Sequence, residues 1–187
     1  VASVPRVETN LRQDMEAHRL LLTPTSQLGG RKQEVAKALH HKGALLFSKE
    51  DYNGAERYLR RALELDATIP DHHLRLGWTL FCNKALTAER RINEARELIE
   101  RAVAMDPYHA EARYSLACYW RDLGNPDNYR RELEAAARGK PRHAKAEKEL
   151  EALKERENRA QDAERRFAEA KAAEKKKFGI GRLFGLD

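Results

Sequence analysis

Four of the seven histidines in this chain form two adjacent pairs, His40-His41 and His72-His73. Histidine is the side chain whose chemistry is most specific, because imidazole binds metals and exchanges protons near neutral pH. Neighbours on a helix point about 100° apart. Such a pair therefore does not chelate one ion from one face, as histidines four residues apart do. The pairs predict no metal site, and we expect no cofactor.

The sequence also lacks the short motifs of common catalytic sites. It holds no glycine-rich phosphate loop and no Gly-x-Ser-x-Gly, and its carboxylates are interspersed with Lys and Arg as on solvated helices. Cys82 and Cys118 form no Cys-x-x-Cys pair, so we expect free thiols in a reducing compartment. No stretch approaches the length of about 20 apolar residues that spans a bilayer. These features predict a cytoplasmic protein that is not an enzyme.

The elements that must position these residues are predicted to be helices. Charged residues make up 35% of the chain and apolar residues 41%, with only 10 Gly and 6 Pro among 187 residues. This composition favours an all-α protein over strand-and-turn architectures. The formal net charge is +6, but most Lys and Arg alternate with Glu. That alternation is typical of salt-bridged helices, and nucleic acid is not an expected partner. A first residue of Val indicates either an alternative start codon or a piece of a longer protein.

A small-large-small rhythm recurs three times along the chain, each time after a small residue in a preceding helical segment. Two helices that pack closely and repeat need this pattern. It predicts three helical hairpins, over residues 36–69, 70–109 and 110–143, with the second six residues longer than the others. The preceding small residues are Gly43, Gly77 and Ala117, and the rhythm is Ala55-Leu59-Ala62, Ala95-Ile99-Ala102 and Tyr129-Leu133-Ala136.

This spacing resembles the tetratricopeptide (TPR) repeat, a helix-turn-helix of about 34 residues. The second repeat matches best, while Lys42, Ala67, Ala117 and Tyr129 depart from the family pattern. The resemblance implies an all-α, right-handed α-solenoid of three hairpins. An unrelated helical bundle with chance spacing is the alternative. The extra residues lie between Leu80 and Ala95, and we expect them to extend the second helix at its start, with Thr87 as the cap.

Segments on either side of the repeats are also predicted to be helical. Residues 1–30 hold a short helix at about 10–22 and a loop, and Leu11, Met15, His18 and Leu22 fall on one face of that helix. We expect Leu20, Leu21 and Leu22 to dock onto the array or a missing partner. Residues 144–177 contain no Gly or Pro and predict a capping helix that extends into a long charged one. Its apolar stripe is thin, so any coiled-coil dimer through it is weak.

In TPR proteins the first helix of each hairpin lines a concave groove, and the resemblance places a partner peptide or helix there. The partner is expected to be more apolar than the acidic tail of a cytosolic chaperone, because Arg75 alone among the family's clamp positions suits a carboxylate. In the alternative interpretation Trp78 and Phe81 pack under the insertion and Phe47 packs against Tyr52. The predicted groove residues are His40, His41, Phe47, Leu74, Arg75, Trp78, Phe81, Tyr114 and Arg121.

The last residues, 178–187, are predicted to be a flexible tail that is rich in apolar residues and directly follows a basic cluster in the sequence. Such a tail suits an anionic membrane surface or the groove of a partner, or it is only a frayed terminus. The chain is thus expected to be a binding scaffold, with a peripheral membrane adaptor and a co-chaperone-associated module as alternatives. The ending loosely resembles the C-terminal TPR arrays of bacterial multidomain proteins with a J-domain or a signalling module. The predicted contacts of the tail are Lys175, Lys176, Lys177, Phe178, Ile180, Leu183 and Phe184.

Overall fold

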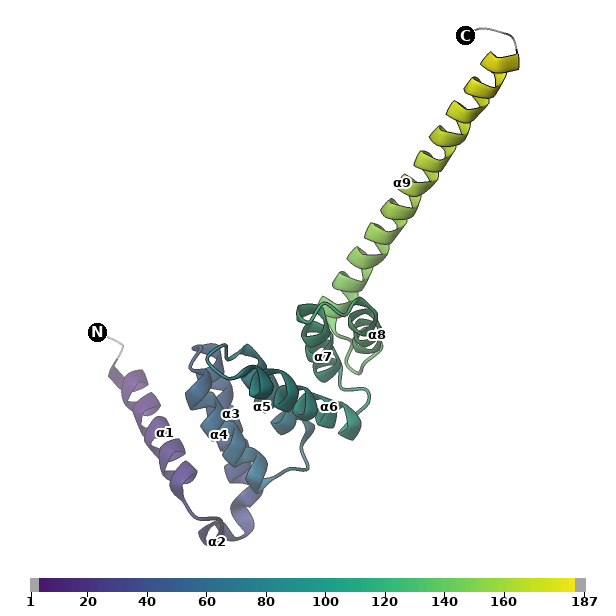
Figure 1. The fold of residues 1–187 in the computed structure, drawn as a ribbon. Helices are drawn as coiled ribbons and strands as arrows, with labels where there is room; N and C mark the ends of the chain where they lie inside the picture. The colour runs from purple at the N-terminus through teal and green to yellow at the C-terminus, as the bar shows by residue number, and fades with distance from the viewer. Residues whose placement is uncertain (1–3, 184–187) are drawn as a thin grey trace. The chain divides into compact units, whose positions relative to one another are not determined.

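The computed structural model describes the backbone of residues 4–183 and the side chains of residues 12–174. Throughout this range the ordered elements are helices and no strand occurs, so the all-α prediction is confirmed. The chain divides into two compact units between His143 and Ala144. The α-helices, labelled in Figure 1, are α1 (Val4–Leu22), α2 (Thr25–Leu28), α3 (Lys32–Ser48), α4 (Tyr52–Leu65), α5 (Pro70–Cys82), α6 (Ala95–Met105), α7 (Ala110–Asp122), α8 (Pro126–Ala137) and α9 (Ala144–Leu183). A 3-10 turn (Gly29–Arg31) precedes α3, and a π-helical segment (Arg90–Glu94) precedes α6.

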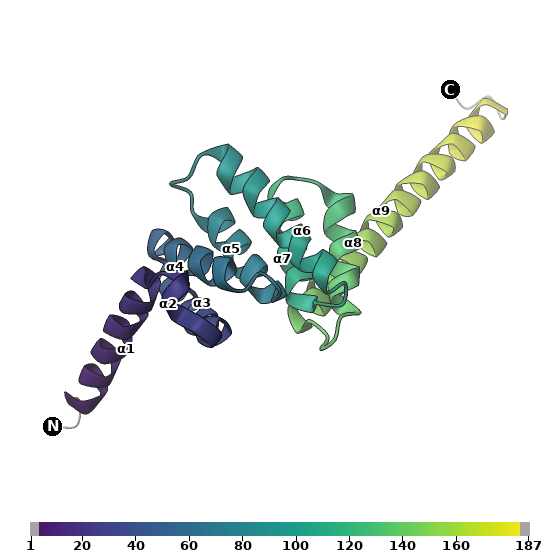
Figure 2. The same cartoon turned by 90° about the horizontal axis from the view of Figure 1, so that it is seen from below.

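Three helical hairpins, α3–α4, α5–α6 and α7–α8, follow one another along the first unit (Figure 2). A Cβ atom added at Gly43 would lie 2.6 Å from Leu59 Cγ, and one added at Gly77 would lie 2.9 Å from Ile99 Cγ1. Both separations are too short for carbon atoms in contact, so glycine is what lets each pair of helices close. The second helices contribute residues that are fully buried, and the recurring rhythm is therefore the packing code of the hairpins. These residues are Ala55, Leu59, Ala62, Ala95, Ile99, Ala102, Leu133 and Ala136.

Local signals set the ends of the repeat helices. Asp51 accepts a hydrogen bond from the Gly54 N–H at 2.9 Å and begins α4, and Asn125 accepts one from the Asn128 N–H at 3.1 Å and begins α8. Pro70 and Pro126 stand in the first turns of α5 and α8, where the missing N–H costs nothing.

The extra residues of the second hairpin extend its second helix, as predicted. After a turn that begins at Asn83, helical backbone resumes at Ala88, and Thr87 Oγ1 accepts a hydrogen bond from the Arg90 N–H at 3.4 Å. The extension runs through the π-helical segment Arg90–Glu94 directly into α6. The π turn was not predicted, because it depends on what the extension packs against rather than on local preference.

Helix α1 packs through a different face from the predicted one. The structure buries Ala17 against the first hairpin, with Leu20 and Leu21 beside it. Met15 and Leu22 are 66% and 65% exposed. Of the three leucines expected to dock onto the array or a missing partner, Leu20 and Leu21 therefore dock onto the array and Leu22 does not. The small side chain of Ala17 lets α1 approach α3, and only residues three and four positions later share its side of the helix.

The second unit is built on α9, a helix of 40 residues. It begins where the predicted helix begins and continues past residue 177 to Leu183, because adding a residue to a formed helix costs far less than starting one. Pairs spaced three or four residues apart, such as Glu155 with Arg159 at 3.1 Å and Asp162 with Arg165 at 3.2 Å, support it. Phe167 is exposed on it.

Candidate functional site

Four of the nine predicted groove residues pack between hairpins, where Leu74 and Phe81 are buried and His40 and Phe47 are half-buried. The His40 ring lies 4.9 Å from that of His72, and the Phe81 ring lies 5.2 Å from that of Tyr119. Phe47 lies under the guanidinium of Arg75, 5.8 Å from ring centroid to carbon. Leu74 is only 3% exposed and belongs to the same core. These side chains join each hairpin to the next.

For Phe47 and Phe81, the structure contains packing contacts of the kind the alternative interpretation names. The ring of Phe47 meets that of Tyr52 edge-on at 5.5 Å, and the guanidinium of Arg91, on the insertion, lies 5.9 Å from the Phe81 ring. Trp78 lies 5.5 Å from Phe81 but stays half-buried. The insertion therefore covers Phe81 and leaves part of Trp78 accessible.

The other predicted groove residues keep accessible surface. His41 and Arg121 are exposed, while Arg75, Trp78 and Tyr114 are half-buried. Tyr114 stacks on His143 with ring centroids 4.1 Å apart, and Arg121 pairs with Asp122 at 3.2 Å. Two of the accessible residues, Arg75 and Trp78, stand three positions apart on α5 and so share one face of it.

Arg75 and Trp78, here called the α5 site, combine a cation with an aromatic surface. Arg75 forms no ion pair with any residue whose side chain the structure describes, and its guanidinium rests on Phe47. A half-buried arginine that packs on an aromatic ring and has no carboxylate partner can still form an ion pair with the carboxylate of a ligand. The indole of Trp78 adds apolar area on the same face of α5. The α5 site therefore suits an apolar segment that carries a carboxylate.

Burial keeps the neighbouring histidine neutral. Burial, with smaller contributions from the nearby His72 and Arg75, lowers the pKa of His40 to about 4. His40 Nδ1 is buried without a hydrogen-bond partner. Around neutral pH, His40 thus adds no positive charge beside the α5 site, and Arg75 supplies the cation there.

Two contacts between a histidine and a carboxylate, at the corners of the repeats, were not predicted. His109 Nε2 lies 3.0 Å from Asp71 Oδ1, and His143 Nε2 lies 2.9 Å from Glu111 Oε2. The hydrogen bond to Asp71 raises the pKa of His109, and the same bond lowers the pKa of Asp71. The signal was present in the repeat alignment, because each carboxylate is the second residue of its repeat and each histidine is the last.

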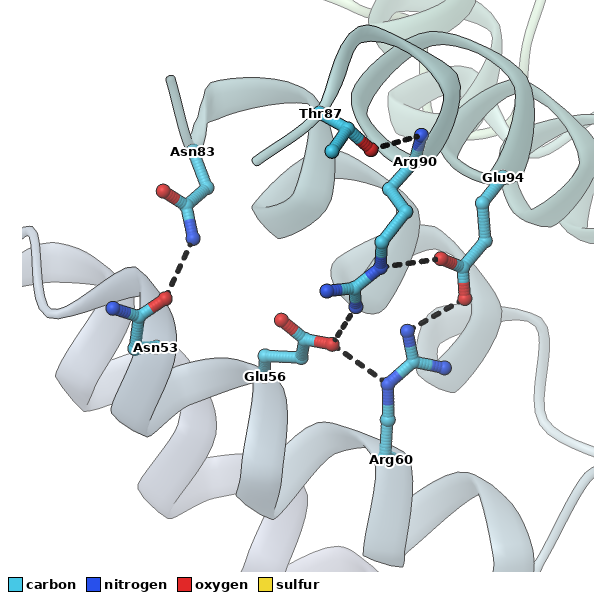
Figure 3. A network of polar contacts seen from close by, with 7 residues as sticks. All are labelled: Asn53, Glu56, Arg60, Asn83, Thr87, Arg90 and Glu94. Carbon is cyan, nitrogen blue, oxygen red and sulfur yellow. Dashed lines mark hydrogen bonds and ion pairs between the residues drawn. The ribbon is translucent and has the colours of Figure 1, made fainter. Parts of the chain in front are cut away.

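A ring of four charged residues ties the insertion to the first hairpin (Figure 3). Glu56 accepts hydrogen bonds from Arg60, at 2.8 Å, and from Arg90; Glu94 accepts from Arg60 at 2.6 Å and from Arg90 at 3.4 Å. Asn83 also donates to Asn53 at 2.9 Å across the same junction. The sequence gives little indication of this ring, because each of the four charged residues taken alone is typical of a solvated helix surface. The ring thus joins α4 of the first hairpin to the insertion of the second hairpin.

The remaining predictions concern metal binding, membrane spanning and the C-terminal tail. Among the described side chains, no three His, Cys, Asp or Glu residues come together as a set of metal ligands. No helix in the described range is both long and apolar enough to cross a bilayer. The tail contacts lie outside the described side chains, namely Lys175, Lys176, Lys177, Phe178, Ile180, Leu183 and Phe184.

The fold of stacked hairpins is that of TPR proteins. It is similar to MamA, with a TM-score of 0.57 and 19% identity over 78% of this chain and 74% of that one. The first TPR of Spaghetti (RPAP3), solved with the HSP90 peptide SRMEEVD, gives a TM-score of 0.55 and 17% identity over 66% and 93%. YrrB, a TPR protein with an unusual peptide-binding site, gives 0.53 and 24% over 64% and 57%.

Similarity in sequence to known proteins is weaker than the similarity in fold. Superkiller complex protein 3 of Mus musculus is 30% identical over 97 residues, which are 51% of this chain and only 6% of that protein. No protein-family model matches the chain. The shared feature is thus the repeat fold, and any function must be argued from this chain's own residues.

Proposed function

We propose that this chain is a non-catalytic scaffold that binds a peptide or helix of another protein at the α5 site. The observation that carries the proposal is the guanidinium of Arg75, which forms no ion pair with a described side chain, packs on Phe47 and lies three residues from the half-buried Trp78. Aromatic residues and arginine are the side chains that most often dominate binding energy at protein interfaces. The partner segment would place an apolar side chain on Trp78 and a single carboxylate against Arg75.

The ligand of this site would differ from the acidic HSP90 peptide found with Spaghetti. Where the family's clamp uses Lys and Asn in the first groove helix, this chain has His40 and Ala44, and where the third groove helix supplies Lys and Arg, it has Glu111 and Ser115. His40 is kept neutral by burial, which lowers its pKa, and Glu111 would repel a second carboxylate. One carboxylate in an otherwise apolar segment fits these residues better than a run of three.

A peptide selection tests the proposal. Peptides selected from a random library on the intact chain are titrated against three variants, Arg75→Ala, Trp78→Ala and Arg101→Ala, the last changing an exposed arginine on α6. We expect the first two to weaken binding at least about tenfold, the loss typical of an interface anchor, and Arg101→Ala to have no effect. SRMEEVD should bind more weakly than the selected peptides. Equal losses in all three variants, or tight SRMEEVD binding, would contradict the proposal.

A further inference from the structure

The junctions between hairpins follow one positional rule. We number the positions of each repeat from its first residue, which is residue 36, 70 or 110. Positions 5 and 12 of one repeat then contact positions 3, 6 and 10 of the next. His40 meets His72 at 4.9 Å, Phe47 meets Arg75 at 5.8 Å, and Phe81 meets Tyr119 at 5.2 Å. Positions 3, 6 and 10 therefore form the face that receives the preceding hairpin. In the second and third repeats these residues are buried, apart from the half-buried Arg75: His72, Arg75, Thr79, Ala112, Ser115 and Tyr119.

The receiving face of the first hairpin is uncovered. Its residues at positions 3, 6 and 10 are Ala38, His41 and Leu45, and all three are exposed. Leu45 retains 42% of its surface, whereas Tyr119, at the same position of the third repeat, retains 1%. The first hairpin thus presents a stacking surface that the other two bury.

Helix α1 stands beside this surface without covering it. Ala17 is buried, Leu20 packs against the cluster of Leu28 and Val35, and Lys42 of α3 bonds to Asp14 of α1. Between the two helices lies a cleft of about 480 Å³. Its lining includes Ala17 and Leu20 from α1 and the three uncovered residues of α3. This is the α1–α3 cleft, and its apolar floor is continuous with the stacking face.

The charges at the cleft are not balanced by the chain itself. Of the acidic lining residues, Asp14 is paired with Lys42, and Glu16 with Arg19 at 2.6 Å. Arg12 also lines the cleft and has no ion pair with the described residues. Among the described lining residues, the rim therefore offers one cation without an ion pair and no carboxylate without one. A ligand that complements it carries negative charge at its edge.

We infer that the α1–α3 cleft is a docking site for an amphipathic helix of a partner protein. The helix packs on α3 as the first helix of a preceding hairpin would, with apolar residues spaced i, i+3 or i+4, and i+7, and a carboxylate beside Arg12. The distance from Ala38 to Leu45 corresponds to about two helical turns, so a partner helix of three turns spans it. The cleft shares no lining residue with the α5 site, and the inference stands independently of the function proposed above.

Two matched peptides test the inference. Both are synthetic 18-residue helices with one Leu/Ala stripe and a fluorescein label; one has Glu flanks and the other has Lys flanks. Fluorescence polarisation with the full chain is expected to show saturable binding of the Glu-flanked peptide, at least about tenfold tighter than the Lys-flanked one. Arg12→Gln is expected to reduce that preference.

The matched variants are Leu45→Gln and Leu123→Gln, because both leucines are 42% exposed and only Leu45 lines the cleft. Leu45→Gln is expected to weaken binding of the Glu-flanked peptide at least about tenfold, while Leu123→Gln leaves its binding unchanged. Ala38→Gln, at the other end of the stacking face, provides a second test should Leu45→Gln unfold. Equal binding to wild type and both cleft variants would overturn the inference. A concentration-dependent dimer that Leu45→Gln abolishes would overturn it too, because a second copy would then be the occupant.

Discussion

The two junctions between hairpins use the same repeat positions but different chemistry. Where the first hairpin meets the second, polar contacts add to the apolar core: His40 on His72, Arg75 on Phe47, and the ring around Glu56. Where the second meets the third, the core is apolar, with Leu74, Phe81 and Tyr119 buried together. The same repeat geometry is therefore expected to give one junction whose stability depends on pH and salt and another whose stability depends on apolar burial. The α5 site lies on α5, the helix that both junctions share.

The largest expected difference between the junctions concerns aromatic truncation. Phe81→Ala should cost about 3–5 kcal/mol of unfolding free energy, because it empties a packed site. Phe47→Ala, at the same repeat position of the polar junction, should cost roughly 1–2 kcal/mol, since Phe47 is half-buried. Urea unfolding followed by circular dichroism measures both, with Phe167→Ala on α9 as an exposed control. Equal costs at the two positions would show that the junctions are not different in kind.

Removing one charge from the ring should have a smaller, salt-dependent effect. Glu56→Gln removes one of the two carboxylates that Arg60 and Arg90 share and leaves them only Glu94; the Glu56 side chain has only 13% of its surface exposed. We expect a loss of about 1–2 kcal/mol, with both arginines able to turn to water. At about 1 M salt the loss should shrink, because charges are screened within a few ångströms.

Glu97→Gln, on the exposed side of α6, is the matched control for this change and should have little effect at any salt concentration. Unfolding free energies at low and high salt provide the measurement. A loss from Glu56→Gln that does not change with salt would mean that the side chain acts through packing rather than charge.

The smallest expected effect is the dependence on pH that His40 gives to the polar junction. Burial lowers the pKa of His40 to about 4, below its unfolded value near 6.5. The unfolded chain therefore binds a proton first, and the stability present above pH 6.5 is lost as the pH falls toward 4. Allowing for the solvent-exposed part of the ring, we expect about 1 kcal/mol. The groups facing His40 are His72, Arg75, Asp71 and His41.

His40→Leu places at this position the residue type that Leu74 supplies at the apolar junction. The variant should flatten the loss of stability between pH 6.5 and 4, as measured by thermal or urea unfolding across that range. His41→Gln, on the exposed side of α3, should keep the wild-type slope. An unchanged slope in His40→Leu would assign the pH dependence to another group.

Much of the fold was predictable because the packing code is local in sequence. Gly43 and Gly77 each face a large residue on the next helix of the same hairpin, and that relation recurs at a fixed spacing. The candidate site was less predictable. His40, Phe47, Leu74 and Phe81 stand at positions that line the groove in the family, yet in this chain they contact the following hairpin. Whether such a side chain is open or covered depends on a neighbour some 30 residues away.

The sequence by itself determined the helices, their pairing into hairpins and the site of the insertion, because caps, glycines and apolar spacing act over one or two turns. Only the tertiary structure decided which faces remain open. It turned Met15 and Leu22 outward, closed the ring between Glu56 and Arg90, and left Leu45 uncovered beside α1. These outcomes depend on the angle and distance between helices, which follow from the combined packing of many side chains and appear in no short segment of the chain.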